Sequence, residues 1–191
     1  GDVNACTLGG ADASSFSCTV NGDSVSLAFS SAPDFENPGS VDSDNDYSVT
    51  VTISDGVNTG ATISYTVTVD DANDFTPSYS AGDLTPSVAE GSTAVDSFTV
   101  SDADTDDVNA CIRGGADAAL FTCTVSGDDI TLAFASAPDY DSASDANSDN
   151  DYIVTVAISD GTNTGSTLSY TVSVTDLNDQ TPTYSSSDTT P

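Results

Sequence analysis

The sequence has almost no basic side chains. Its 191 residues contain a single Lys or Arg, Arg113, against 31 acidic residues, and its formal net charge is −30. A chain this negative repels phosphate backbones and anionic lipid, so nucleic-acid binding is excluded as a function. His, Lys, Met and Trp are absent, which removes the usual general base, the Schiff-base amine and the usual transition-metal ligand. No apolar run approaches the roughly 20 residues of a membrane-spanning helix. We therefore expect no catalysis and no membrane span.

Residues typical of β-strands and turns make up most of the chain. Thr, Val, Ser, Asp and Gly abound, while Glu, Gln, Lys, Arg and Met, which favour helices, are nearly absent. High net charge is also typical of disordered chains, but apolar residues alternate with period two, most clearly at Tyr152, Val154 and Val156. The alternation predicts strands near residues 84–89, 93–101, 108–112, 120–125, 129–134, 151–159 and 166–176.

The chain repeats itself with an offset of 105 residues. Residues 1–86 match residues 106–191 without a gap, and more than half of the aligned positions are identical. This period is about the size of one small domain. We expect residues 1–74 to be a repeat that lacks its first strands, residues 75–179 a complete repeat, and residues 180–191 the start of a third. The sequence has the character of an internal segment of a tandem array.

Seven short strands in about 105 residues, separated by Gly- and Asp-rich turns, predict a Greek-key β-sandwich of immunoglobulin-like type. The fold class that we expect is therefore all-β, with tandem sandwiches joined end to end. The Cys…Trp…Cys pattern of antibody domains is absent because the chain has no Trp.

Acidic residues and Asn gather at the predicted strand ends. Calcium takes six to eight oxygen ligands from carboxylates, Asn side chains and backbone carbonyls, and magnesium suits such clusters less well. An isolated acid such as Asp23 or Asp188 is more simply a solvated turn residue. The loop Asp42-Ser-Asp44-Asn-Asp46 fits a solvated loop and an additional ion equally well. The clustered candidates are Asp34, Glu36, Asp55, Asp71, Asn73 and Asp74 in the first repeat, and Glu90, Asp102, Asp104, Asp139, Asp141, Asp160, Asp176, Asn178 and Asp179 in the second.

Taken in order, these clusters resemble the calcium motifs of cadherin-type repeats, in the version common in bacterial surface adhesins. The matching pieces are Val-Ala-Glu90-Gly, Asp102-Ala-Asp104, Pro-Asp34-Phe-Glu36, Ile-Ser-Asp160-Gly and Asp71-Ala-Asn73-Asp74, and the resemblance covers essentially the whole chain. It implies a cadherin-like fold with Ca²⁺ bound at the junction between successive repeats.

The resemblance also implies a ligand set for the one junction that the sequence contains whole. Up to three ions would be held by Asp34, Glu36, Asp71, Asn73, Asp74, the backbone carbonyl of Phe75, Glu90, Asp102, Asp104, Asp160 and the carbonyl of Asn109. The sequence departs from the family pattern in two respects. Phe75 and Gln180 stand where the family linker often has Asn, and Asp141 stands where the first repeat has Glu36.

The four cysteines form two pairs with the same spacing. Cys6 and Cys18 recur as Cys111 and Cys123. Their spacing is not a zinc pattern, and the chain has no His to complete one. An even number of cysteines in a protein of extracellular character favours disulfides over reduced thiols, so we expect the pairs Cys6–Cys18 and Cys111–Cys123. Strand alternation leaves open whether Cys111 faces inward.

These features predict a calcium-rigidified, non-catalytic structural repeat of a large extracellular adhesin stalk or surface filament at the cell surface. Its partners would be neighbouring repeats of the same array, or identical chains in a filament. The alternative is a ligand-binding or homophilic adhesion module that presents Thr-rich strands, such as residues 48–52 and 65–69, to a sugar, to ice or to a partner repeat. A glycosidase with paired carboxylates is disfavoured because the acids lie at domain ends.

Overall fold

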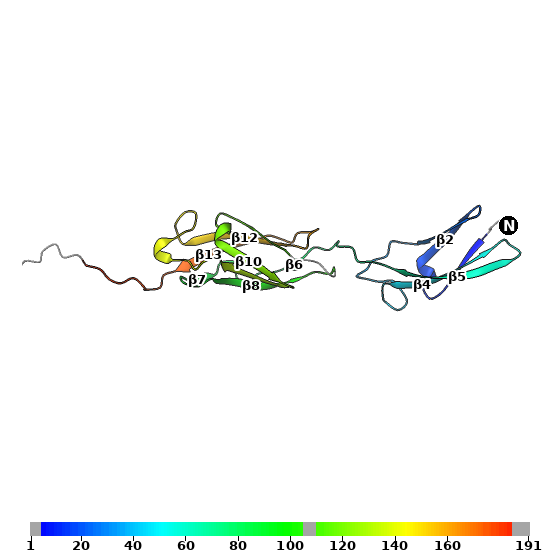
Figure 1. Cartoon of the computed structure of the whole chain (residues 1–191), viewed down its shortest axis with the longest axis horizontal. Helices are drawn as coiled ribbons and strands as arrows, with labels where there is room; N and C mark the ends of the chain where they lie inside the picture. Colours follow the sequence, from blue (N-terminus) through cyan, green and yellow to red (C-terminus); the bar gives the residue numbers. More distant parts are fainter. Residues whose placement is uncertain (1–4, 105–109, 185–191) are drawn as a thin grey trace, which may run out of the picture. The chain divides into compact units, whose positions relative to one another are not determined.

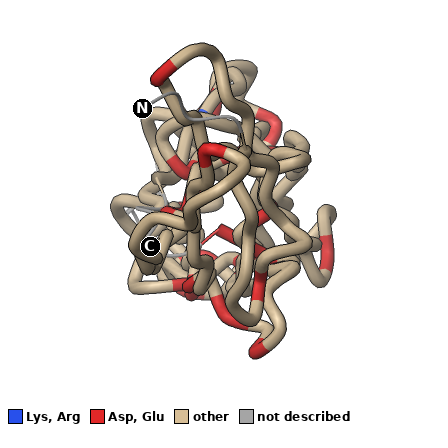
Figure 2. The backbone as a smooth tube through the Cα atoms, turned by 90° about the vertical axis from the view of Figure 1, so that its right-hand side faces the viewer, with Lys and Arg blue, Asp and Glu red and all other residues tan. Residues whose placement is uncertain are grey.

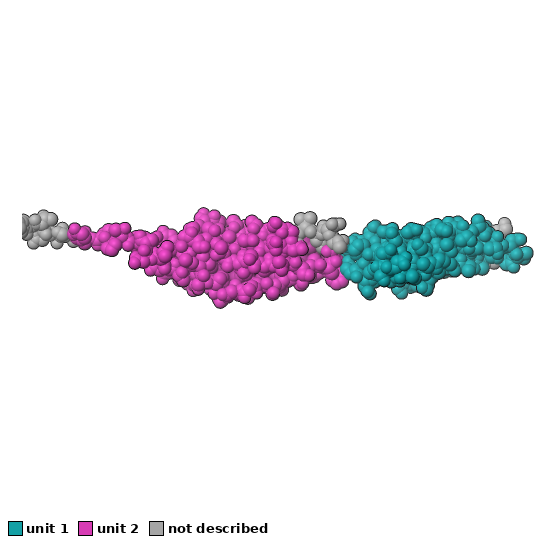
Figure 3. Space-filling view, turned by 90° about the horizontal axis from the view of Figure 1, so that it is seen from below, with its two compact units in different colours: residues 1–72 teal, residues 73–191 magenta. Residues whose placement is uncertain are grey.

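The computed structural model describes residues 5–104 and 110–184 of the chain. Its contacts divide the chain into two compact units, unit 1 (Gly1–Ala72) and unit 2 (Asn73–Pro191), which Figure 3 draws in two colours. The described residues of both units form strands, and the helices among these strands are short 3₁₀ helices. Among the described residues, no helix has the length and apolar character that crossing a bilayer requires. The predicted all-β fold class is confirmed.

Unit 2 is a sandwich of two four-stranded sheets (Figure 1). One sheet has the strand order β10-β11-β8-β6 and the other β7-β13-β12-β9. Among the described residues of unit 2, the strands pair antiparallel except β7 and β13, which pair parallel. The strands are β6 (Ser78–Tyr79), β7 (Ser87–Ala89), β8 (Ala94–Ser101), β9 (Ala110–Gly114), β10 (Phe121–Ser126), β11 (Asp129–Phe134), β12 (Asp151–Ser159) and β13 (Leu168–Thr175), with 3₁₀ helices η2 (Ala118–Leu120) and η3 (Tyr140–Ser142).

The core of unit 2 follows from the alternation in its strands. Along β12 the side chains of Tyr152, Val154 and Val156 are fully buried, and each contributes roughly 1.5–3 kcal/mol by leaving water. Phe121 stacks on Phe134 with ring centroids 4.5 Å apart, and Tyr152 makes T-shaped contacts with both rings. The predicted strand 151–159 therefore has the bounds observed. The first predicted strand is shorter than expected, and β6 was not predicted.

Unit 1 repeats the later strands of unit 2. A three-stranded sheet has the order β1-β4-β5, and β2 pairs with β3. Its described residues include no counterpart of β6, β7 or β8, and its buried hydrophobic residues are few, namely Phe16, Tyr47, Val49 and Val51. The elements are β1 (Ala5–Gly9), η1 (Ala13–Ser15), β2 (Phe16–Asn21), β3 (Ser24–Phe29), β4 (Asp46–Ser54) and β5 (Thr59–Thr68).

Both predicted disulfides are confirmed. Cys6 bonds to Cys18 and Cys111 to Cys123, with Cα atoms 6.3 and 6.1 Å apart. Each disulfide joins two strands that both units contain, β1 to β2 in unit 1 and β9 to β10 in unit 2. Cys111 is half-buried and packs against the core of unit 2, which answers the question that strand alternation left open.

A buried Asp in each repeat holds the long loop over the sheet. Asp117 is 4% exposed, and its two carboxylate oxygens accept hydrogen bonds of 2.7 Å from the amides of Ala146 and Ile153. Asp12 in unit 1 makes the equivalent pair of bonds. Gly115, two residues earlier, has φ +96°, and a Cβ there would lie 2.7 Å from the Ile153 carbonyl oxygen. The repeated Gly-Gly-Ala-Asp segment therefore requires Gly for close approach and Asp for two backbone amides.

The same loop contains a second buried acid, Asp145. It is 5% exposed and accepts hydrogen bonds from the amides of Asn147, Asp149 and Asn150 at 3.0–3.3 Å. Burial works against the charge, but the three amides outweigh it and lower the pKa of Asp145. In unit 1 its counterpart is Ser40, whose hydroxyl accepts the amide of Asp44 at 2.9 Å.

Replacing Asp145 tests this loop. Asp145→Ala should lower the free energy of unfolding of unit 2 by about 2 kcal/mol at neutral pH, because three amides lose their acceptor. Asp145→Ser should recover part of that loss, as Ser40 does in unit 1. Since the folded pKa is lowered, the contribution is full above the ordinary Asp value of 3.8 and is lost as the pH falls through the folded pKa. Urea unfolding followed by NMR signals of unit 2, at neutral pH and near pH 3, measures both effects. A difference between wild type and Asp145→Ala that is equal at both pH values would contradict the assignment.

Candidate metal centre

Three carboxylates of unit 2 converge where two strands end. Asp102 and Asp104 follow β8, and Asp160 follows β12. Each contributes an oxygen, and these oxygens lie within 4.8 Å of one another. Asp104 is 8% exposed and Asp160 5% exposed. Acidic positions mark many of the loops of the chain (Figure 2), but this group is distinguished by its closeness and its burial.

Backbone and amide groups hold the cluster in place. Asp160 accepts hydrogen bonds from the amides of Thr162 and Asn163 at 2.7 and 2.6 Å, while Asp104 accepts the amide of Phe75 at 2.8 Å. The side-chain amide of Asn163 donates to the Phe75 carbonyl at 2.6 Å and to the Asn73 side-chain oxygen at 3.0 Å. Asn163 was not predicted as a site residue. Its signal in the sequence is the Ser-Asp-Gly-x-Asn turn, which recurs at Asp55 and Asn58.

The electrostatics of this cluster favour a hard cation. Desolvation opposes the charge of Asp160, but the amides of Asn163 and Thr162 and the side chains of Asn73 and Asn163 outweigh it, so its pKa is lowered and it stays ionised. Within the described residues, the second oxygens of Asp102 and Asp160 are buried and accept no hydrogen bond. Buried anionic oxygens without donors are costly unless a positive charge balances them. An all-oxygen set of this kind fits Ca²⁺.

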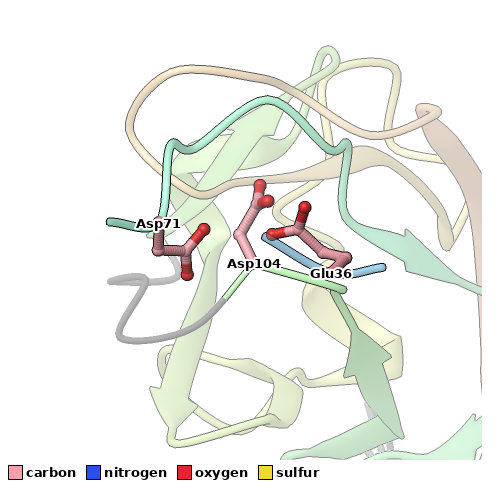
Figure 4. A group of neighbouring side chains, drawn as sticks. All are labelled: Glu36, Asp71 and Asp104. Carbon is pink, nitrogen blue, oxygen red and sulfur yellow. The ribbon is translucent and has the colours of Figure 1, made fainter. Parts of the chain in front are cut away.

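Unit 1 has its own pair of converging carboxylates. Glu36 lies in the loop between β3 and β4, Asp71 follows β5, and they offer oxygens within 4.8 Å of each other (Figure 4). Asn45 holds this loop by donating to the carbonyl of Phe35 at 3.0 Å. Asp34, by contrast, accepts the amide of Asn37 within its own turn at 3.1 Å. Asp104, also labelled in Figure 4, belongs to the cluster of unit 2 described above.

The predicted grouping of Glu90 with Asp102, Asp104 and Asp160 is wrong. Glu90 follows β7, which runs parallel to β13 and ends beside Thr175. The end of β13 pairs with the start of β12. From Asp151 to Ser159 the strand β12 runs eight residue steps, or about 26 Å, and Asp160 follows its far end. Glu90 therefore lies at the opposite end of unit 2.

At that opposite end, Glu90 is 6% exposed and is held by two backbone amides. It accepts hydrogen bonds from the amides of Tyr140 at 2.7 Å and Leu177 at 2.6 Å. The acids around it repel one another. Desolvation is the largest effect that raises the pKa of Asp141, and repulsion raises it further from Asp176, Glu90, Asp179 and Asp139. The second repeat thus gathers acids at both of its ends.

The other predicted ligands are placed as follows. The Phe75 carbonyl and the Asn73 side chain both accept from Asn163, and Asp74 is exposed. Asp55 accepts the amides of Val57 and Asn58, which lower its pKa, and the described part of unit 1 contains no counterparts of Asp102 and Asp104 beside it. Asp139, Asp176, Asn178 and Asp179 are exposed at the Glu90 end. Asn109 lies outside the described residues.

The fold of the chain is that of cadherin extracellular domains. No family model matches the sequence, and no curated protein matches it. A protocadherin gammaB7 structure of domains EC3-6, described as a cis-dimer, aligns with a TM-score of 0.62 and 22% identity over 92% of this chain and 41% of that chain. The human desmocollin-1 ectodomain aligns with a TM-score of 0.60 and 16% identity over 86% of this chain and 32% of that one.

A shorter structure shows the same likeness. Human protocadherin-24 EC1-2 aligns with a TM-score of 0.55 and 18% identity, over 90% of this chain and 81% of that chain. The chain thus spans less than half the length of the protocadherin gammaB7 chain and most of the length of this two-domain structure. At these identities the likeness defines a cadherin-like β-sandwich and nothing finer.

Glu90 provides a test of the acids at the second end. Glu90→Gln should destabilise unit 2 by about 1–2 kcal/mol with a chelator present, because one of the two amides that Glu90 accepts loses its acceptor. Asp179→Asn removes a negative charge at the same end without removing either hydrogen bond, so it should be neutral or slightly stabilising. Urea unfolding of both variants measures the difference. Equal stability of Glu90→Gln and wild type would show that the two hydrogen bonds contribute little.

Proposed function

We propose that this chain is a calcium-rigidified structural segment of a large extracellular adhesin, acting as part of a stalk or surface filament and carrying out no catalysis. The cadherin-like fold supports an extracellular adhesion role, and the two disulfides fit an oxidising compartment. The bacterial origin suggested by the sequence motifs belongs to this proposal as well.

The observation that carries the proposal is the cluster of Asp102, Asp104 and Asp160. These residues would hold Ca²⁺, which supplies positive charge to a chain that has a single Arg. Asp102 and Asp160 each offer a buried oxygen that accepts no hydrogen bond from the described residues. Glu36 and Asp71 supply a second carboxylate pair, in unit 1.

The mechanical role follows from charge. Without cations, carboxylates gathered at the ends of a repeat repel one another, as the raised pKa of Asp141 indicates for one end of unit 2. Ions held by acids of successive repeats would replace that repulsion with attraction and would limit bending at the linker. Binding to the folded state alone also stabilises it by mass action.

Thermal unfolding with millimolar Ca²⁺ and with a chelator tests the proposal. We expect Ca²⁺ to raise the melting temperature of the wild-type chain. The double variant Asp102→Asn/Asp160→Asn should lose most of that rise and should bind Ca²⁺ at least about tenfold more weakly in calorimetry, because two anionic ligands become neutral. Asp128→Asn, in an exposed hairpin turn, removes one charge elsewhere and should behave as wild type.

Small-angle scattering separates rigidity from stability. The calcium-loaded chain should give an extended profile with little flexibility, and the chelated chain a broader distribution of dimensions. Melting temperatures and profiles that are the same with Ca²⁺ and with chelator would disprove the proposal and leave an acidic sandwich that acts through its faces.

A further inference from the structure

The side chain of Asn163 joins the Asp160 turn to the backbone that leads into the sandwich of unit 2. Its amide nitrogen donates to the carbonyl of Phe75 at 2.6 Å and to the side-chain oxygen of Asn73 at 3.0 Å. These partners lie 88 and 90 residues away along the chain. The contact is therefore tertiary, and it holds residues 73–75 against a turn that begins at the end of β12.

The turn itself does not need this side chain. The backbone amide of Asn163 donates to the Asp160 carboxylate at 2.6 Å, and the amide of Thr162 donates to the same oxygen at 2.7 Å. The carbonyl of Asn163 accepts the hydroxyl of Ser159 at 2.7 Å and the amide of Asp160 at 3.3 Å. Residues 162 and 163 make all of these bonds with backbone groups, so a change of the Asn163 side chain leaves the turn closed.

Residues 73–75 also contact the cluster of three carboxylates described above for unit 2. The amide of Phe75 donates to Asp104 at 2.8 Å, while its carbonyl accepts from Asn163. The Phe75 carbonyl and the Asn73 side chain thus bring two neutral oxygens to the turn that carries Asp160. Ca²⁺ takes such oxygens together with carboxylates. A carbonyl oxygen has two lone pairs, so one that accepts from Asn163 can still face an ion.

The same turn in unit 1 directs its Asn to a different acceptor. There the side-chain amide of Asn58 donates to the second carboxylate oxygen of Asp55 at 3.2 Å. In unit 2 the amide of Asn163 is bonded to residues 73–75, and the second oxygen of Asp160 is buried without a donor among the described residues. The turn therefore has two hydrogen-bonding arrangements within reach, and the one seen in unit 2 leaves a carboxylate oxygen available to a cation.

We propose that Asn163 is a positioning residue that couples cation binding by the three-carboxylate cluster to the docking of residues 73–75. When these residues are docked, the amide holds their oxygens beside the turn and leaves the second oxygen of Asp160 to the ion. When they are undocked, the amide turns to Asp160, as Asn58 does to its own Asp, and competes with the ion. The inference rests on the proposed calcium site and adds what controls its occupancy.

The coupling works in both directions. A factor by which docking of residues 73–75 raises the affinity for the ion is also the factor by which the ion favours docking. Calcium in the cluster would therefore hold more firmly the backbone that leads into unit 2. Asn163 would in this way turn ion binding into restraint of a segment that carries no carboxylate of the cluster.

An NMR titration of the 191-residue chain with Ca²⁺ tests the coupling. The backbone amides of Phe75 and Thr162 report on this site separately from acids elsewhere, because both donate to carboxylates of the cluster. Asn163→Ala should weaken the Ca²⁺ binding read at these amides by about tenfold or more, since it removes a group that orients metal ligands. Asn58→Ala, the matched change in unit 1, should leave this affinity unchanged. Unchanged signals around Tyr152 verify that unit 2 stays folded.

Hydrogen exchange of the Phe75 amide measures docking without an ion. With a chelator present, Asn163→Ala should speed this exchange several-fold relative to wild type, because residues 73–75 lose two hydrogen bonds that hold them. Asn58→Ala should exchange as wild type does. Adding Ca²⁺ should slow the exchange in the wild type, and most of that slowing should be lost in Asn163→Ala.

The two measurements separate this inference from the calcium site on which it rests. Ca²⁺ binding by Asn163→Ala that is as tight as in wild type, or tighter, would overturn the coupling, because the amide would then only compete with the ion. Unchanged exchange of Phe75 in that variant would also overturn it, since other contacts would hold residues 73–75. Wild-type amides of Phe75 and Thr162 that do not respond to Ca²⁺ would disprove the calcium site and the coupling with it, while faster exchange of Asn163→Ala in chelator would still identify Asn163 as the residue that holds the segment.

Discussion

The shortage of positive charge is the constraint on which the rest of the structure depends. With one Arg against 31 acids, a buried carboxylate can be balanced only by backbone amides or by a cation from solution. Asp117, Asp145 and Glu90 take the first route, and each accepts two or three amides. Asp102 and Asp160 differ, because each keeps a buried oxygen without a donor among the described residues. The structure thus separates acids that hold loops from acids that suit an ion.

The internal repeat acts as a control for packing. Tyr47 and Tyr152 are both buried because β2 and β3, or β10 and β11, cover them in each unit. Tyr65 and Tyr170 differ because β7 and β8 cover that part of the sheet in unit 2, while the described residues of unit 1 include no counterparts of these strands. Identical residues can therefore be core in one repeat and surface in the next. Burial here is a property of the neighbouring segment and not of the strand sequence.

The features that the sequence predicted well depend on residues that are close together along the chain. Alternation fixed the bounds of β12, and the equal spacing of the cysteines predicted both disulfides. The role of Glu90 could not be read, because residues 90 and 102 are close in sequence while β8 carries the chain the length of the sandwich between them. Asp117 and Asn163 were missed for a related reason. Their partners, Ile153 and Phe75, lie far along the chain, and the residue types alone are those of ordinary turns.

The three-carboxylate cluster of unit 2 and the packing of Tyr79 are linked through a short stretch of backbone. Phe75 donates its amide to Asp104 and accepts the side chain of Asn163, and Tyr79 follows four residues later as the contact between β12 and β13. Placing Tyr79 in the sandwich therefore also places the Phe75 backbone against the acids. Unit 1 keeps Asp55 and Asn58 of the equivalent turn, but its described residues include no counterparts of β7 and β8 or of Asp102 and Asp104. The turn alone therefore does not assemble a three-carboxylate cluster, because two of the carboxylates in unit 2 follow β8.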